Sequence, residues 1–266
     1  MRKILLYLIF PGLLVLMFSC EYYLGFDQQP KFRNETIEEG LNIFGILRPD
    51  SLESFNRSFV YVHRVMPVME PENFFILHDA VVKIEKIIGE NNSEIIEFPL
   101  VPPNMVFPDT AYRPLSGFSP MAGERYRISC MLNGFPEATG ETTIPSIPEI
   151  VPNTLTVNDR TVSFTLAPDS LTGMIDIYHV TDYFYLPLTR LIPSVGMGTE
   201  VVLTLPVAPA GTRFIIYAYD QNMAVYIGNS NISLNFNKFR KTFSTLESGF
   251  GVFGGMNYCE VELGGR

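Results

Sequence analysis

The chain has 266 residues, 47% of them apolar, which is ample for a buried core. Its net charge of −9 repels phosphate backbones and therefore disfavours a nucleic-acid binder. The 20 prolines and 20 glycines, among many β-branched and aromatic residues, favour short strands separated by turns.

The chain begins with a pattern that is typical of an export signal. Arg2 and Lys3 precede an apolar run over 4–18, and the small residue Ser19 stands directly before Cys20. The run is only about 15 residues long, whereas about 20 are needed for a spanning helix. A cysteine directly after such a cleavage site accepts diacylglyceryl lipid in bacterial lipoproteins. We therefore predict a lipoprotein signal peptide at 1–19 and lipid attachment at Cys20.

Two other interpretations of this segment stay open. The apolar run could be retained as a single-span anchor, or an ordinary signal peptide could end near Ser19 with Cys20 incidental. If Cys20 is lipidated, it carries several fatty chains such as palmitate, and these hold a protein stably at a membrane. Residues 20–39, polar from Gln28 onward, are then expected to form a tether.

The rest of the chain is dominated by a period of two residues, which is typical of half-buried strands. Val82 and Ile84, for example, alternate with Lys83 and Glu85. Strands are predicted at 41–47, 58–65, 82–85, 95–100, 125–132, 139–144, 161–166, 174–179, 200–205, 213–219 and 258–263. Turn residues separate them, and this spacing indicates antiparallel β-sandwiches.

A proline-containing run over 144–152 is the best domain boundary, because proline cannot donate to the ladder of a central strand. We predict an N-terminal domain at 40–148 and a C-terminal β domain at 149–266. Cys130 and Cys259 fall at inward positions of their predicted strands. We expect them to lie in separate cores as small apolar residues without a disulfide.

Two aromatic segments follow in the second half. Tyr183, Phe184 and Tyr185 are the most suggestive candidates for contact with a ligand or partner, although their rings could simply pack into the core. Farther on, phenylalanines at i, i+3 and i+7 with basic residues between them predict a short amphipathic helix over 236–243. It is expected to cap the second sandwich, or else to face a membrane or a partner.

The run 249–254 spells G-x-G-x-x-G, but a dinucleotide site requires a helix after it and an acidic residue about 20 positions on. The remaining residues alternate as a strand instead. The glycines are therefore expected to allow a bulge or the close approach of a neighbouring strand.

No catalytic, metal or cofactor motif is recognised. His63, His78 and His179 have no metal-ligand spacing, and no nucleophile motif is present. The segments 169–173 and 220–222 are only partly similar to calcium loops, and turn chemistry explains them better.

The order of features resembles a lipoprotein family of Bacteroidetes-type bacteria known as "domain of unknown function 4249". The similar segments are the opening strand 41–46, the Ala-Val strand 80–84, the Gly-x-x-Tyr strand 123–128, the Thr-Thr-Ile-Pro exit 142–145 and the glycine-rich run 248–254. The opening strand departs from the family pattern at Asn42 and Phe44.

This resemblance implies two β domains, the first immunoglobulin-like, in a lipoprotein anchored at the outer membrane. It also implies an accessory role beside a TonB-dependent outer-membrane receptor, and it supplies no catalytic residues. We therefore expect an all-β protein of two antiparallel sandwiches with a short helix near the C-terminus. The leading hypothesis is a non-enzymatic binding protein of the cell envelope; the alternatives are a carbohydrate-binding module and a hydrolase whose site the sequence does not reveal.

Overall fold

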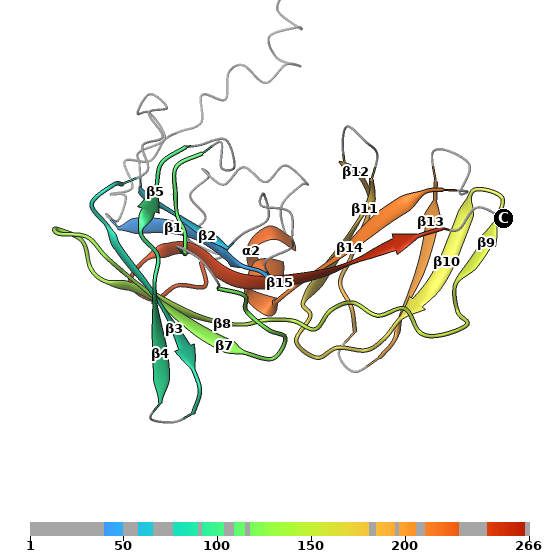
Figure 1. Cartoon of the computed structure of the whole chain (residues 1–266), viewed down its shortest axis with the longest axis horizontal. Helices are drawn as coiled ribbons and strands as arrows, with labels where there is room; N and C mark the ends of the chain where they lie inside the picture. The colour runs from blue at the N-terminus through green and yellow to red at the C-terminus, as the bar shows by residue number, and fades with distance from the viewer. Residues whose placement is uncertain are drawn as a thin grey trace, which may run out of the picture. The chain divides into compact units, whose positions relative to one another are not determined.

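The computed structural model describes residues 40–49, 58–65, 77–89, 92–103, 109–114, 118–180, 185–194, 197–205, 211–228 and 244–263. Over these ranges the chain is built of strands β1 to β15 with one short helix, α2, near the C-terminus (Figure 1), which confirms the predicted all-β class. The predicted signal peptide, Cys20, the tether and the helix predicted at 236–243 lie outside the described residues.

The first sandwich consists of two sheets that alternate along the chain. Its strands are β1 (Leu41–Leu47), β2 (Phe59–Arg64), β3 (Val81–Ile87), β4 (Ser93–Glu97), β5 (Leu100–Val101), β6 (Ala111–Tyr112), β7 (Arg125–Met131) and β8 (Ala138–Thr143). The strand orders are β1-β2-β6-β5 and β4-β3-β7-β8. These orders correspond to the A-B-E-D and C′-C-F-G sheets of an immunoglobulin-like fold. The predicted immunoglobulin-like character of the first half is therefore confirmed.

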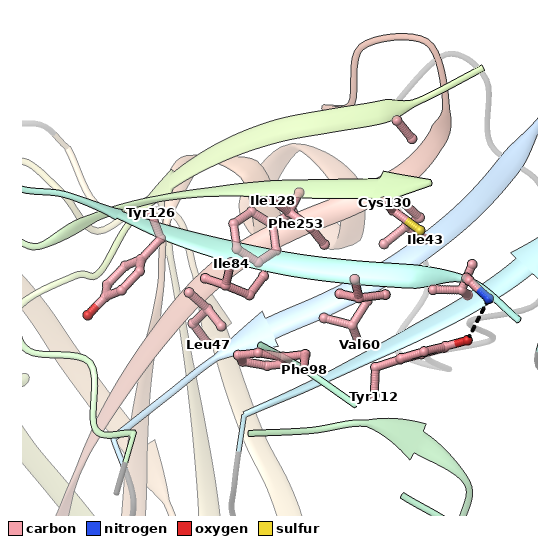
Figure 2. Close-up of a cluster of buried hydrophobic side chains, with 14 of the residues drawn as sticks. Ile43, Leu47, Val60, Ile84, Phe98, Tyr112, Tyr126, Ile128, Cys130 and Phe253 are labelled. Atoms are coloured by element: carbon pink, nitrogen blue, oxygen red, sulfur yellow. Dashed lines mark hydrogen bonds between the residues drawn. The ribbon is translucent and has the colours of Figure 1, made fainter. Parts of the chain in front are cut away.

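The core of this sandwich is filled by alternate residues of the facing strands, such as Ile84, Ile128 and Val60, and by Phe98 from the β4–β5 connection (Figure 2). One buried polar group is satisfied inside it. The Tyr112 hydroxyl accepts a hydrogen bond of 3.1 Å from the backbone N–H of Ala80 and donates one to the carbonyl of Leu77. Burial raises the pKa of Tyr112 to about 12, so this hydroxyl remains a donor.

The second sandwich has three strands facing four. Its strands are β9 (Thr156–Asn158), β10 (Thr161–Leu166), β11 (Met174–Val180), β12 (Tyr185–Leu191), β13 (Thr199–Thr204), β14 (Arg213–Tyr219) and β15 (Phe250–Glu262). The order β13-β10-β9 faces the order β12-β11-β14-β15. Between the two sheets the rings of Phe164 and Phe214 stack with their centroids 5.7 Å apart. Such aromatic pairs add to the stabilisation that comes from buried area alone.

The two thiols lie where the alternation predicts them. Cys130 is fully buried in the first core, and Cys259 packs against the second core. Both are free, which confirms the prediction that they form no disulfide. Burial raises the pKa of Cys130 to about 12 and that of Cys259 to about 11. Neither thiol therefore carries the thiolate character of a reactive cysteine at neutral pH.

Strand β15 belongs to both halves (Figure 1), and this pairing is not anticipated by the sequence. Its first part runs parallel to β1, with Phe253 opposite Gly45, and its second part runs antiparallel to β14, with Tyr258 opposite Tyr217. The result is one eight-stranded sheet in the order β12-β11-β14-β15-β1-β2-β6-β5. A residue of β15, Phe253, is completely buried in the first core.

Gly249, just before β15, and two glycines within the strand permit this crowded position, which confirms the role predicted for the glycines of 249–254. Gly251 has φ +101, and a Cβ there would overlap the carbonyl oxygen of Ile43. A Cβ at Gly249 would lie 2.6 Å from Cβ of Ala138 on β8. At Gly254, a Cβ would overlap the side chain of Met223 on α2. The strand therefore needs glycine to approach a strand on one side and a helix on the other.

Helix α2 (Gln221–Gly228) packs on part of the face of the long sheet that lies opposite the two sandwich cores, in one cluster with Phe44, Tyr219 and Val252. The sequence assigns 220–222 to a turn, and the structure instead makes Asp220 the cap of this helix. Its Oδ1 accepts a hydrogen bond of 2.9 Å from the backbone N–H of Met223, which satisfies a free donor of the first turn. Among the described residues, no helix has the length and hydropathy required to span a bilayer.

Candidate functional site

Only part of the predicted aromatic contact segment is described. Tyr183 and Phe184 lie outside the described residues. Tyr185 begins β12, which is an edge strand of the eight-stranded sheet, and 52% of its surface is exposed. Its ring is therefore not packed into the second core.

Tyr185 adjoins a row of side chains that crosses four neighbouring strands. The strand register places Arg190 of β12 opposite Asp176 of β11, Asp176 opposite Tyr217 of β14, and Tyr217 opposite Tyr258 of β15. Residues in such register share one face of a sheet. The alternate positions of the same strands, such as Ile177 and Ile216, fill the second core. The row therefore projects from the opposite face.

The rings on this face touch one another. Tyr178 and Tyr217 have centroids 5.7 Å apart with planes at 76°, and Tyr217 lies 6.0 Å from Tyr258 and 6.3 Å from Tyr219. We define the tyrosine face by seven residues: Tyr178, Tyr185, Tyr217, Tyr219 and Tyr258, with Asp176 and Arg190. Tyr178, Tyr217 and Tyr258 are partly exposed, so a contacting molecule can reach them.

One end of the tyrosine face is held by a bidentate ion pair. Arg190 donates from Nε to Oδ1 of Asp176 over 2.7 Å and from Nη2 to Oδ2 over 2.6 Å. The hydrogen bonds from Arg190 to Asp176 raise the pKa of the guanidinium, so Arg190 remains a cation. Two parallel charge-assisted bonds fix both side chains in one geometry. They also attach the edge strand β12 to its neighbour β11.

The hydroxyls of Tyr178, Tyr217 and Tyr219 are neutral donors. Burial raises the pKa of Tyr217 to about 12 and raises the pKa of Tyr178 and Tyr219 as well. Arg48, just after β1, adds a cation near Tyr217 and Tyr219, and its burial lowers its pKa. The face therefore combines apolar ring area, hydroxyl donors and fixed charges. This combination suits recognition rather than proton transfer at neutral pH.

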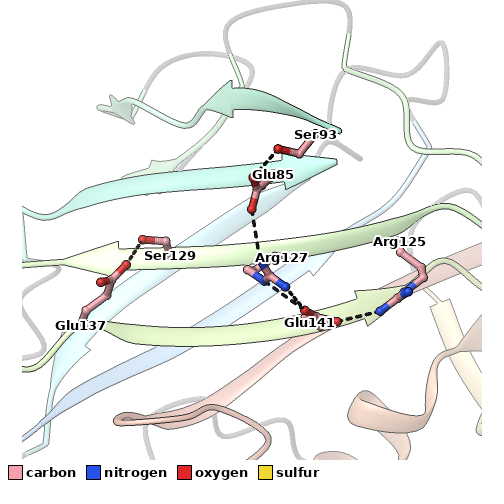
Figure 3. A network of polar contacts seen from close by, with 7 residues as sticks. All are labelled: Glu85, Ser93, Arg125, Arg127, Ser129, Glu137 and Glu141. Carbon is pink, nitrogen blue, oxygen red and sulfur yellow. Dashed lines mark hydrogen bonds and ion pairs between the residues drawn. The ribbon is translucent and has the colours of Figure 1, made fainter. Parts of the chain in front are cut away.

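The outer face of the sheet β4-β3-β7-β8 is different, because its charges neutralise one another (Figure 3). Glu141 accepts hydrogen bonds from Arg125 and from Arg127, and Arg127 also pairs with Glu85. The hydrogen bond from Arg127 is the main reason why the pKa of Glu141 is lowered. Solvated pairs of this kind contribute little to binding or stability. We interpret this charged face as a solvating surface.

The described residues do not suggest a catalytic centre. Among them, no group of three or more His, Cys, Asp or Glu side chains could hold a metal ion. Two of the three histidines lie on separate strands of the eight-stranded sheet that are not neighbours: His63 on β2 beside the ring of Tyr61, and His179 on β11 with little exposure. Asp169 forms a turn, as predicted, through hydrogen bonds from Leu171 N–H and the Thr172 hydroxyl.

The sequence alone misses most of the tyrosine face. Tyr217 and Tyr219 alternate with inward Ile216 and Ala218, so the pattern does indicate an aromatic outer side of that strand. Their neighbour Tyr258, however, lies on a strand about 40 positions away. Only the register of β11, β14 and β15 brings these rings together.

The comparisons with known proteins assign no function to this chain. No protein-family profile matches the chain, and no curated protein is similar to it. Among solved structures, the selenomethionine-substituted chicken interferon gamma receptor alpha chain aligns with 68% of this chain and 86% of its own. The identity is 10% and the TM-score is 0.21, so this alignment carries no argument about function. The description of the fold rests on the strand orders given above.

Proposed function

We propose that this chain is a non-enzymatic lipoprotein of the cell envelope whose tyrosine face binds a partner protein. The observation that carries the proposal is the row Arg190, Asp176, Tyr217 and Tyr258, which presents rings and a fixed ion pair on one side of four adjacent strands. Tyrosine and arginine are the side chains that most often dominate the energy of protein interfaces. Tyrosine supplies large contact area at low entropic cost.

The proposed location at the outer membrane rests on Cys20. A lipid anchor there, followed by the tether 20–39, would hold the sandwiches at the surface of the outer membrane. A protein confined to that surface meets membrane partners far more often than a free one does. The anchor and the tyrosine face thus support the same kind of function.

The proposed partner is a TonB-dependent outer-membrane receptor. The choice of this partner rests on the resemblance to the lipoprotein family "domain of unknown function 4249". Two segments behind that resemblance have structural roles here: 142–145 ends β8, and 248–254 begins the strand that is shared by both sandwiches.

Carbohydrate binding is the second candidate, because Tyr185 presents an exposed ring at a sheet edge. Sugar rings stack on flat aromatic surfaces. The planes of Tyr178 and Tyr217 are 76° apart and those of Tyr217 and Tyr258 are 48° apart, so these rings offer no common plane. The tilted arrangement favours a protein partner with an irregular surface.

The test is affinity purification of the full chain from solubilised envelopes, with mass spectrometry of what is recovered. The wild type should recover a β-barrel receptor. The double variant Tyr217→Ala and Tyr258→Ala should recover at least about ten-fold less, as expected for two interface anchors. Arg125→Ala on the charged face is the matched control and should recover as much as the wild type.

Three results would separate the alternatives. Equal recovery by the double variant and the wild type would remove the tyrosine face from the proposal. Recovery of no barrel protein by any of the chains would remove the receptor. Binding to a glycan array that is lost in Tyr185→Ala would favour the carbohydrate-binding alternative. Circular dichroism and thermal melting must first establish that each variant is folded.

A further inference from the structure

A cavity of about 380 Å³ lies at the end of the second sandwich, away from the tyrosine face. It is bordered by the segment 146–149 that leaves the first sandwich, by the β10–β11 connection and by the β12–β13 connection. Cavities of small-molecule sites have volumes of about 300–1,000 Å³. This cavity is therefore large enough for a compact ligand.

Part of the lining of the cavity is apolar. Leu166, Ile175 and Ala218 form the floor, and all three side chains are almost fully buried. Pro148 and Pro168 contribute walls that lack backbone N–H groups, so these stretches offer few hydrogen-bond donors. A ligand body that contacts these surfaces must itself be largely apolar.

The rim carries large apolar side chains that are exposed. Ile147 is 54% exposed and Met197 is 63% exposed, and both line the cavity. A methionine side chain is flexible and adapts to the shape of a bound molecule. Covering these two side chains with a ligand would remove apolar surface from water, which is favourable.

The wall beside the mouth is held in place before any ligand binds. Asp169 accepts hydrogen bonds of 3.0 Å from the N–H of Ser146 and 2.6 Å from the hydroxyl of Thr172. The N–H of Ala167 donates a hydrogen bond of 2.8 Å to the carbonyl of Glu149. These bonds join the segment from the first sandwich to the end of β10. A preformed wall lowers the ordering cost of binding.

The charged residues that line the cavity are all acidic. The described residues that line the cavity include the acidic Asp169 and Glu149 and no lysine, arginine or histidine. Burial would raise the pKa of Asp169, but the hydrogen bonds from Thr172, Leu171 and Ser146 together outweigh it and lower the pKa, so Asp169 is anionic at neutral pH. A cationic head group is therefore favoured here, and an anionic one is repelled.

We propose that this cavity binds a small aliphatic amine. Its alkyl chain lies on Leu166, Ile175 and Ala218, and its ammonium group lies at the mouth near Glu149. Asp169 has most of its oxygen lone pairs engaged, so it contributes charge rather than a direct hydrogen bond. This binding goes beyond the proposed function and does not depend on it.

The test follows ¹³C-methyl chemical shifts of the full chain during titration with three probes of equal length: hexylamine, hexanol and hexanoate. Ile147, Ile175 and Met197 report from the cavity, and exposed Ile95 on β4 reports from the other sandwich. The cavity signals should shift saturably, with the tightest binding for hexylamine and the weakest for hexanoate. The Ile95 signal should stay in place.

Charge reversal makes the test specific. Glu149→Lys should weaken hexylamine binding about five- to ten-fold and favour hexanoate, since an exposed attraction becomes an exposed repulsion. Glu94→Lys on β4 changes the net charge equally and should leave the order of the probes as it is in the wild type. Equal affinity for hexylamine and hexanoate, unchanged selectivity in Glu149→Lys, or the absence of saturable shifts at millimolar amine would overturn the proposal.

Discussion

The hydroxyl of Thr142 donates a hydrogen bond of 2.5 Å to Oδ2 of Asp220, although the two residues are 78 positions apart. Thr142 lies on β8 of the first sandwich, whereas Asp220 caps α2 directly after β14 of the second. The backbone N–H of Asp220 also donates to the carbonyl of Gly255 on β15 over 3.0 Å. The buried carboxyl group of Asp220 thus links the two halves of the chain.

The stability of the protein should depend on the protonation of Asp220. Burial raises the pKa of this carboxyl group to about 6, against the hydrogen bonds from Thr142 and Met223 that lower it. Because the folded pKa lies above the unfolded value, the folded state binds the proton more tightly. The stabilisation is complete below the unfolded pKa and is lost as pH rises through about 6. A shift of about two pKa units corresponds to roughly 3 kcal/mol of free energy of unfolding.

Asp220→Asn should therefore flatten the dependence of stability on pH between about 4 and 7, as measured by urea unfolding at a series of pH values. Asp169→Asn is the control with the opposite sign. Because hydrogen bonds lower the pKa of Asp169, its contribution is present above about pH 4 and is lost as pH falls further, so its variant should lose a constant amount of stability across this range. Identical pH profiles for Asp220→Asn and the wild type would contradict the assignment.

The close approach of α2 to β15 should make Gly254 intolerant of any side chain. An added Cβ would overlap Met223 and lie 2.8 Å from Oδ1 of Asp220. We expect Gly254→Ala to lower the free energy of unfolding by about 2–4 kcal/mol, because a crowded site cannot accept volume without backbone shifts. Gly89→Ala is the matched control, since a Cβ there meets nothing within 4 Å. Equal melting temperatures for the two variants would show that the helix moves aside freely.

The strands predicted from clear alternation are present in the structure. Alternation of apolar and polar residues can be read from neighbouring positions in the sequence, without knowledge of the strand partners. The strand predicted at 213–219 is β14, and that predicted at 174–179 is β11 with one more residue. In each, one side meets the second core and the other side does not, so a period of two survives in the sequence. The inward thiol of Cys130 follows from the same rule.

The elements that the sequence misses have identifiable causes. The first part of β15 is buried on both sides, so it shows no alternation, and only its last residues are predicted as a strand. Strand β12 contains Pro187, which a central strand excludes and an edge strand tolerates. Helix α2 has Met223, Tyr226 and Ile227 at helical spacing, but eight residues are too few for a periodic signal. The tyrosine face could not be predicted because it depends on the register between strands that are far apart in the sequence.

The two sandwiches should not fold independently, despite the proline-containing run between them. Phe253 of β15 is buried in the first core, and the same strand pairs with residues 42–47 of β1. We expect residues 40–148 alone to show no cooperative thermal transition, because an exposed strand edge and an unfilled core would remain. Adding a peptide of residues 244–256 should restore a transition, whereas the same peptide with Phe253→Ala should not. A cooperative transition of 40–148 near that of the full chain would refute this coupling.

Membrane attachment should depend on one sulfur atom. Cys20→Ser should abolish labelling by radioactive palmitate and move the protein from the membrane fraction to the soluble fraction, because a hydroxyl cannot form the thioether. Several acyl chains bind a bilayer stably, whereas tyrosine and leucine side chains near residue 20 supply only weak interfacial contact. Cys259→Ser is the matched control, since that thiol packs against the second core and should leave labelling unchanged. Persistent membrane association of unlabelled Cys20→Ser would instead support a retained apolar anchor over 4–18.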